Sequence, residues 1–142
     1  MSFKNCLPII LILFLMSCGF SEGKKEAEEL AEEMFYDLKA NNYDNLSIYF
    51  SDKFFQDTSL DRWIKMLKNI NKKLGHLESF ELQKWSTKKG VHTSGSGTLV
   101  NLQYNVKYIK YPAVVTISIV KPIGGDMKIR GFNINSIGFM EE

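Results

Sequence analysis

Few residues in this chain combine a reactive side chain with a spacing that suggests chemistry. The 142 residues include two cysteines and two histidines: Cys6, Cys18, His76 and His92. Their spacing matches no zinc site, and two cysteines are too few for a disulfide framework. We therefore expect no metal and no cofactor, and Cys18 is left as the residue with the clearest chemical context.

Carboxylates, which are frequent general bases, are unevenly distributed along the chain. No aspartate or glutamate occurs between Glu81 and Asp126, and His76 and His92 are expected in loops exposed to solvent. Proton abstraction beside a carbonyl needs a base of tuned pKa near the substrate. We therefore expect a protein that is not an enzyme, and isomerase-like catalysis is the least favoured function.

The chemistry open to Cys18 follows from the residues before it. A lysine near the amino terminus, an apolar run and the small residue Ser17 have the order of a secretory signal peptide. A helix extended as far as Phe20 would span only about 22 Å, against about 30 Å for the hydrocarbon core of a bilayer. Leu15-Met16-Ser17-Cys18 resembles the bacterial lipobox, which implies diacylglyceryl attachment to the Cys18 thiol and cleavage before this residue.

This interpretation sets the boundaries of the chain and its location. Residues 1–17 are a cleaved lipoprotein signal peptide, and residues 18–25 are a polar, lipidated tether. The alternatives are an uncleaved anchor and cleavage elsewhere by the general signal peptidase. Cys6 has no apolar run before it and competes poorly. We expect a lipid-anchored protein of the bacterial cell envelope, and Gly19 after the cysteine favours the outer membrane over the inner membrane or the cell surface.

Apolar residues at spacings of three and four predict three helices after the tether. The first starts at Glu26 and ends at Asn41-Asn42, and its acidic residues lie away from the apolar stripe. A shorter helix follows around residues 46–54. The third begins after Thr58 or Ser59 and ends at Gly75.

The second half of the chain alternates between apolar and polar residues, which is typical of strands. We expect strands near residues 80–85, 100–108, 111–121 and 127–137, with a glycine- and serine-rich connection at 89–97. The last strand changes its apolar phase across Gly131, as a β-bulge would. Helices followed by an antiparallel meander predict an α+β domain over residues 26–142.

Four stretches carry a resemblance to a known superfamily. They are Asn42-Tyr43-Asp44, Trp63 to Gly75, "VNLQYNV" from Val100, and "KIRGFNIN" from Lys128. With the order of the elements, they resemble the cone-shaped nuclear-transport-factor-like (cystatin-like) superfamily, and within it small uncharacterised domains on bacterial lipoproteins. The resemblance implies a curved four-stranded antiparallel sheet around three helices. It also implies a cavity between sheet and helices, which relatives use for small ligands, subunit contacts or catalysis.

Six aromatic residues are candidates to line such a cavity and to contact an apolar ligand or a partner's side chain. Packing in the hydrophobic core is the alternative role for each of them. The candidates are Tyr49, Phe50, Trp63, Trp85, Tyr104 and Tyr108.

The expected function is a membrane-anchored lipoprotein with a non-catalytic domain that binds a small molecule or an envelope protein. The alternative is a structural or assembly protein that forms a homodimer through its sheet face. Residues 18–61 carry four lysines against eleven acids, whereas residues 62–130 carry thirteen basic residues against three acids. The basic residues could face anionic lipid or glycan, or could balance the acidic first helix. We expect no nucleic-acid partner outside the cytoplasm.

Overall fold

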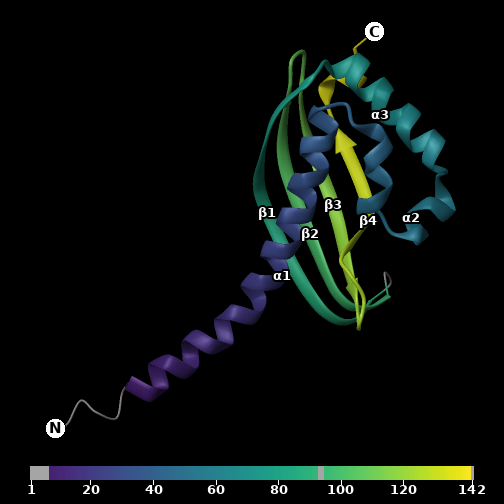
Figure 1. The fold of residues 1–142 in the computed structure, drawn as a ribbon. Helices are drawn as coiled ribbons and strands as arrows, with labels where there is room; N and C mark the ends of the chain where they lie inside the picture. The colour runs from purple at the N-terminus through teal and green to yellow at the C-terminus, as the bar shows by residue number, and fades with distance from the viewer. Residues whose placement is uncertain (1–6, 93–94, 142) are drawn as a thin grey trace.

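Helices occupy the first half of the chain and strands the second half (Figure 1). The computed structural model describes residues 7–92 and 95–141, with side chains at 23–90 and 96–141. The predicted α+β class, with three helices before an open four-stranded antiparallel sheet, is confirmed. The elements are α1 (Leu7–Lys39), the 3-10 helix η2 (Tyr43–Tyr49), α2 (Asp52–Asp57), α3 (Leu60–Leu74), β1 (Leu77–His92), β2 (Gly95–Tyr108), β3 (Pro112–Pro122), β4 (Lys128–Asn135) and the 3-10 helix η3 (Ile137–Phe139).

The first helix is longer than predicted. α1 begins at Leu7 and runs without a break through residues 18–25, which we expected to be an irregular tether. Part of the reason is local, because Lys24 and Glu28 form an ion pair of 2.7 Å one helical turn apart. The carboxy-terminal half of α1 lies along the sheet, and its amino-terminal half projects away from the domain (Figure 1).

The ends of the other helices follow from capping side chains. The Ser59 hydroxyl accepts a hydrogen bond from the Arg62 amide at the start of α3, and Gly75, with φ of 88°, ends that helix as predicted. The single short helix expected before α3 is instead two elements, η2 and α2. They are separate because Phe50 and Ser51 are extended, and the Ser51 hydroxyl then caps α2.

The sheet has the order β1-β2-β3-β4, and all neighbouring strands are antiparallel. Alternate residues are buried over Val100–Tyr108 of β2 and Ala113–Ile119 of β3, which places one face of the sheet against the helices. We call the opposite face the outer face. The register between β3 and β4 shifts where Gly131 pairs with Ser118 and Ile129 pairs with Ile119. This shift confirms the bulge predicted at Gly131.

The glycine- and serine-rich connection predicted at residues 89–97 is mostly strand. The β1–β2 ladder continues through the pair Gly90–Gly97 to His92–Gly95. Gly97 has φ of 130°, and a Cβ there would lie 2.2 Å from the Lys121 carbonyl oxygen. Glycine therefore lets β2 approach β3 closely at this end of the sheet.

Both edges of the sheet are protected from pairing with another chain. At the β4 edge, Phe50 forms an isolated parallel bridge to Ile129, and the Ser51 amide donates to the Ile129 carbonyl at 2.9 Å. The β1 edge carries two register shifts and exposed charged residues such as Glu81 and Lys84. Bulges and charges are features by which natural sheets avoid pairing at their edges.

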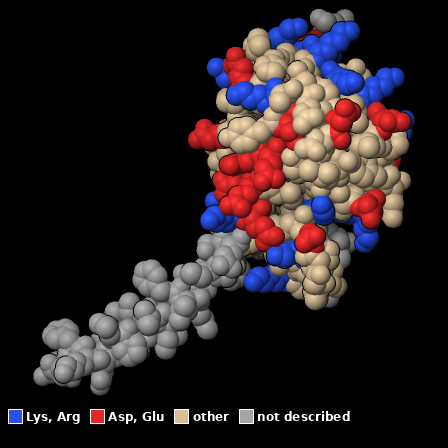
Figure 2. Space-filling model, in the orientation of Figure 1, with Lys and Arg blue, Asp and Glu red and all other residues tan. Residues whose placement is uncertain are grey.

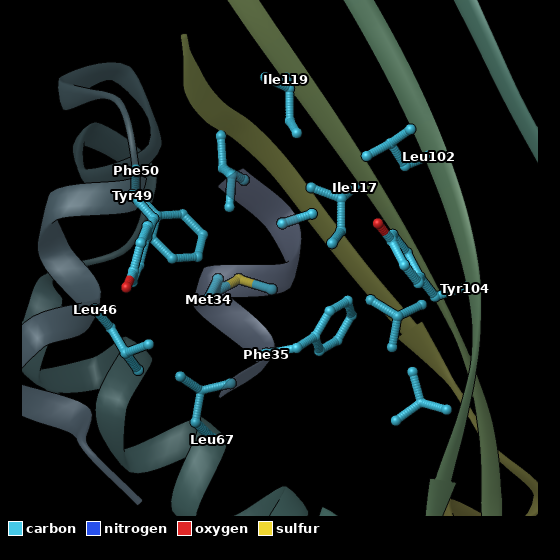
Figure 3. Close-up of a cluster of buried hydrophobic side chains, with 14 of the residues drawn as sticks. Met34, Phe35, Leu46, Tyr49, Phe50, Leu67, Leu102, Tyr104, Ile117 and Ile119 are labelled. Carbon is cyan, nitrogen blue, oxygen red and sulfur yellow. The ribbon is translucent and has the colours of Figure 1, made fainter. Parts of the chain in front are cut away.

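The hydrophobic core lies between α1, the shorter helices and the inner face of the sheet. Met34 and Phe35 point from α1 into the space between η2 and the sheet (Figure 3). The Phe35 ring lies 4.9 Å from the Tyr104 ring in an edge-to-face arrangement. Trp63 of α3 contacts Phe132 of β4 in the same way, with ring centroids 5.0 Å apart. These contacts fix the helices on the sheet.

Candidate functional site

A row of side chains crosses all four strands on the outer face. The register pairs Glu81 with Asn105, Asn105 with Val114, and Val114 with Asn135. These four residues line a groove of about 670 Å³, which we call the outer groove. Since they come from four strands, the pairing of the whole sheet is needed to bring them together.

The second row and the end of the chain complete the outer groove. Ser79, Lys107 and Pro112 form the neighbouring row, and Ile137 and Met140 form an apolar wall. Ile137 is 60% exposed and Met140 82% exposed, which is a high exposure for such large apolar side chains. Lys107 is held at 3.4 Å from the Glu78 carboxylate at the rim.

The wall is positioned by the segment that follows β4. The Ser136 hydroxyl donates to the Pro112 carbonyl oxygen at 2.7 Å and accepts from the Gly138 amide at 3.1 Å. Gly138 is buried, and a Cβ there would lie 2.6 Å from side-chain atoms of both Leu74 and Tyr111. The side chain of Ser136 and the small size of Gly138 thus dock η3 against β3 and α3.

The chemistry of the outer groove suits an amphipathic ligand. Asn105 and Asn135 offer amide donors and acceptors, Ser79 offers a hydroxyl, and the apolar wall lies beside them. Of the residues that line the groove, Glu81 is the acidic one, and none is histidine or cysteine. Such a lining can orient a ligand through its amide, hydroxyl and apolar groups.

Beyond the groove, the outer face carries polar side chains together with the apolar pair Leu99 and Val120. A second hollow of about 320 Å³ is lined by residues that include Lys84, Gln103 and Thr116. Nearby, the Ser118 hydroxyl donates to the Asn101 side-chain oxygen at 2.7 Å. The outer face thus mixes polar rows with apolar residues at the outer groove and at the Leu99–Val120 pair.

Five of the six aromatic residues proposed to line a cavity are buried in the core. They are exposed by 7% or less. Trp85 is the exception: it is 49% exposed, borders the second hollow, and has the Lys24 ammonium 5.8 Å from its ring centroid. The buried residues are Tyr49, Phe50, Trp63, Tyr104 and Tyr108.

Core side chains occupy the space in which the resemblance implies a cavity. The hollow found between helices and sheet has a volume of about 20 Å³ and borders Tyr43, Asn71 and Tyr108. This is room for about one water molecule, far less than a small-molecule site needs. Three buried polar atoms, the Tyr104 hydroxyl, the Trp63 indole nitrogen and the Arg130 Nε, have no hydrogen-bond partner among the described residues.

The clearest cluster of hydrogen-bonded polar side chains surrounds Asp37, where α1 meets η2. The Tyr49 hydroxyl donates to its carboxylate at 2.5 Å, and the amides of Asn45 and Asn42 donate at 2.9 and 3.2 Å. Burial raises the pKa of Asp37, but these three hydrogen bonds lower it more, so its pKa lies below the usual value. A carboxylate held in this way joins α1 to η2 and is a poor proton acceptor.

Acidic residues gather on the solvent-facing side of α1 (Figure 2). Burial, together with the neighbouring charges of Glu28 and Glu29, raises the pKa of Glu32. Across the residues described here, no three histidine, cysteine or acidic side chains come together as a metal site. These acidic residues form a charged, solvent-facing surface of α1.

The side chain of Cys18 lies outside the described residues, and its backbone is part of α1.

The residues after Cys18 have the Gly-x-Ser-x-Gly spacing of a nucleophile elbow, in Gly19-Phe20-Ser21-Glu22-Gly23. That motif requires a strand, a sharp turn and a helix, whereas this whole stretch is helical. None of the helices within residues 7–92 and 95–141 is both long and apolar enough to cross a membrane.

Comparisons of the chain with models of known families, with curated proteins and with solved structures found no match. The residues of the outer groove were not identified from the sequence. One partial signal was present, because Val114 is an apolar residue on the side of its strand that carries Thr116 and Ser118, although Val120 on the same side is apolar too. Its partners are distant in sequence, and only the strand register brings them together.

Proposed function

We propose that this chain is a lipid-anchored protein of the bacterial envelope, with acyl chains on Cys18 and a domain that binds an amphipathic ligand without chemical turnover. The finer fold assignment, a nuclear-transport-factor-like domain, is part of this proposal. It is supported by helices packed on one face of a four-stranded antiparallel sheet. The location, with the outer membrane favoured, rests on the lipobox-like residues Leu15 to Cys18.

The observation that carries the binding function is the outer groove. Its volume of about 670 Å³ falls within the range of small-molecule sites, whereas the hollow beside Tyr43 and Tyr108 between helices and sheet has about 20 Å³. Its lining combines an exposed apolar wall with amide and hydroxyl groups, which is the composition of sites that fix the orientation of a ligand. The ligand is a small molecule or a short segment of an envelope protein.

The alternative function is assembly of two copies through the sheet. The apolar residues at the groove, Val114, Ile137 and Met140, favour some contact there. Polar side chains such as Asn101, Gln103 and Thr116 on the outer face disfavour a large interface. We therefore place ligand binding before dimerisation.

The anchoring half of the proposal is tested by intact-mass analysis of the protein extracted from bacterial membranes. We expect the mass of a chain that starts at Cys18 and carries acyl groups, and we expect Cys18→Ala to be released from membranes or to stay unprocessed. Unchanged mass and unchanged membrane retention of Cys18→Ala would contradict lipid attachment at this residue.

The binding half is tested by a photo-crosslinking residue placed in living cells at Val114. The matched control position is Ile109, which is 61% exposed and is not among the groove's lining residues. The adduct mass distinguishes a small molecule, another protein and a second copy of the chain. Equal labelling at both positions, or none at Val114, would rule out the outer groove as the binding site.

A further inference from the structure

One end of the domain combines an exposed apolar turn, lysine side chains and the exit of α1. This end is opposite to the outer groove: Lys107 pairs with Pro112 at the groove end, and Thr98 pairs with Lys121 nine ladder positions away. At about 3.3 Å per residue, the two ends lie about 30 Å apart along the strands. We call the end around Lys121 and the β3–β4 turn the anchor end.

The exit of α1 at the anchor end is fixed by three contacts. Gly23 lies against the Thr98 methyl group, with 3.9 Å between that carbon and a Cβ built on the glycine. Glu26 forms an ion pair of 3.0 Å with Lys121, and Lys24 lies over the Trp85 ring. From this point the helix leaves the sheet and projects away from the domain (Figure 1).

The β3–β4 turn presents one apolar side chain to solvent. Ile123 is 85% exposed, the highest exposure among the large apolar side chains at 23–90 and 96–141. The Gly125 amide donates to the Pro122 carbonyl oxygen at 3.0 Å, and Gly124 has φ of 73°. A hydrogen bond across four residues with a glycine at positive φ in the third position is the geometry of a type II turn. The turn thus holds Ile123 at its tip, where no core residue covers it.

Ile123 and Cys18 are separated by similar lengths of chain from the place where α1 meets Thr98 and Lys121. Cys18 precedes Gly23 by five helical residues, a rise of about 7.5 Å. Ile123 follows Lys121 by two residues, about 7 Å in extended chain. Acyl chains on Cys18 would therefore hold the turn at the surface of the bilayer.

We propose that the anchor end is a second membrane contact, in which Ile123 enters the headgroup region of a phospholipid bilayer. Lys88, which is paired with Leu99 next to Thr98 in the β1–β2 ladder, brings its ammonium group to the lipid phosphates, while Lys121 stays paired with Glu26. This proposal rests on the proposed lipid anchor at Cys18. An apolar residue at a turn tip beside lysines matches the apolar and charged layers of a bilayer surface. The contact fixes the orientation of the domain and points the outer groove away from the membrane.

The test places an indole at each end of the full chain purified from bacterial membranes and reconstituted in phospholipid vesicles. Both variants carry Trp85→Phe, which removes the exposed native indole, and both retain Trp63, which is buried. Ile123→Trp probes the anchor end. Met140→Trp is the matched control, because Met140 is 82% exposed and lies at the groove end.

Vesicle flotation measures anchoring, and quenching by lipids brominated on their acyl chains measures contact with the bilayer. We expect both variants to float, with the Ile123→Trp indole losing most of its emission and shifting to the blue while the Met140→Trp indole is unchanged. Flotation without selective quenching at position 123 would overturn the membrane contact and leave the anchor intact. Failure of the full chain to float would overturn the anchor and the membrane contact together.

Discussion

Gly138→Ala tests whether the apolar wall of the outer groove depends on one buried glycine. The added Cβ would lie 2.6 Å from Leu74 Cδ2 and from Tyr111 Cδ2, and Leu74 is fully buried. Contacts this short require the neighbours or η3 to move, and overpacking of this kind costs typically 1–3 kcal/mol. We expect the free energy of unfolding to fall by about 2 kcal/mol and the melting temperature by roughly 5–10 °C.

The assay is urea unfolding combined with thermal melting. Gly131→Ala is the matched control, because its Cβ would meet Ser118 at an ordinary 3.5 Å, and we expect its unfolding free energy to change by less than about 0.5 kcal/mol. The double variant Gly138→Ala with Leu74→Ala locates the clash. Leu74→Ala alone should cost about 2–5 kcal/mol, and relief of the contact should make the double variant cost less than the sum.

Two results would refute this reasoning. If Gly138→Ala is as stable as the wild-type chain, η3 accommodates the methyl group and is not locked by the glycine. If the single costs add without coupling, the loss of stability arises away from Leu74.

The remaining predictions concern backbone and side-chain contacts inside the fold. Gly97→Ala should lower the free energy of unfolding in urea by at least about 2 kcal/mol more than Gly90→Ala does. Both glycines have positive φ, but a Cβ at Gly97 would also lie 2.2 Å from a backbone oxygen. Equal losses would show that only the backbone strain at positive φ matters. Tyr49→Phe should cost about 1–2 kcal/mol at neutral pH, since it removes a hydrogen bond to the Asp37 carboxylate. The hydrogen bonds hold the pKa of Asp37 in the folded protein below its value in the unfolded chain. The stabilisation by the Asp37 carboxylate is therefore present above about pH 4 and is lost as the pH falls through the folded pKa. Unfolding measured at a series of pH values will show this loss. Tyr104→Phe should leave the unfolding free energy unchanged or raise it by up to about 1 kcal/mol, because the buried hydroxyl has no partner among the described residues; a large loss would reveal a hydrogen bond that these residues do not provide.

The elements with strong local signals could be predicted from the sequence. The apolar stripe of α3, its cap at Ser59 and its stop at Gly75 all depend on residues close together in the chain. The bulge at Gly131 could be predicted because a change of apolar phase in one strand reports it directly. Residues 18–25 show the limit of this approach: a glycine-containing polar stretch suggested a tether, but ion pairs one turn apart support continuation of the helix.

The outer groove could not be predicted from local pattern. Glu81, Asn105, Val114 and Asn135 become neighbours only through the register of three strand pairs. A slip of one residue in any pair would turn its side chains to the other face. The wall adds a second requirement, since Ile137 is positioned by hydrogen bonds of Ser136 that form only after β3 is in place.

The packing of the interior explains why a binding site is expected outside it. Phe50 and Phe132 contact Trp63 edge to face, and Phe35 contacts Tyr104, so the rings that were candidates for lining a cavity contact one another instead. Opening a cavity of several hundred Å³ there would separate these rings, and each lost pair costs about 0.5–1.5 kcal/mol beyond the exposed area. The outer groove exists without separating these rings, because its floor is the outer face of the sheet and its wall consists of Ile137 and Met140. A ligand that binds there therefore meets a preformed surface and need not compete with the core.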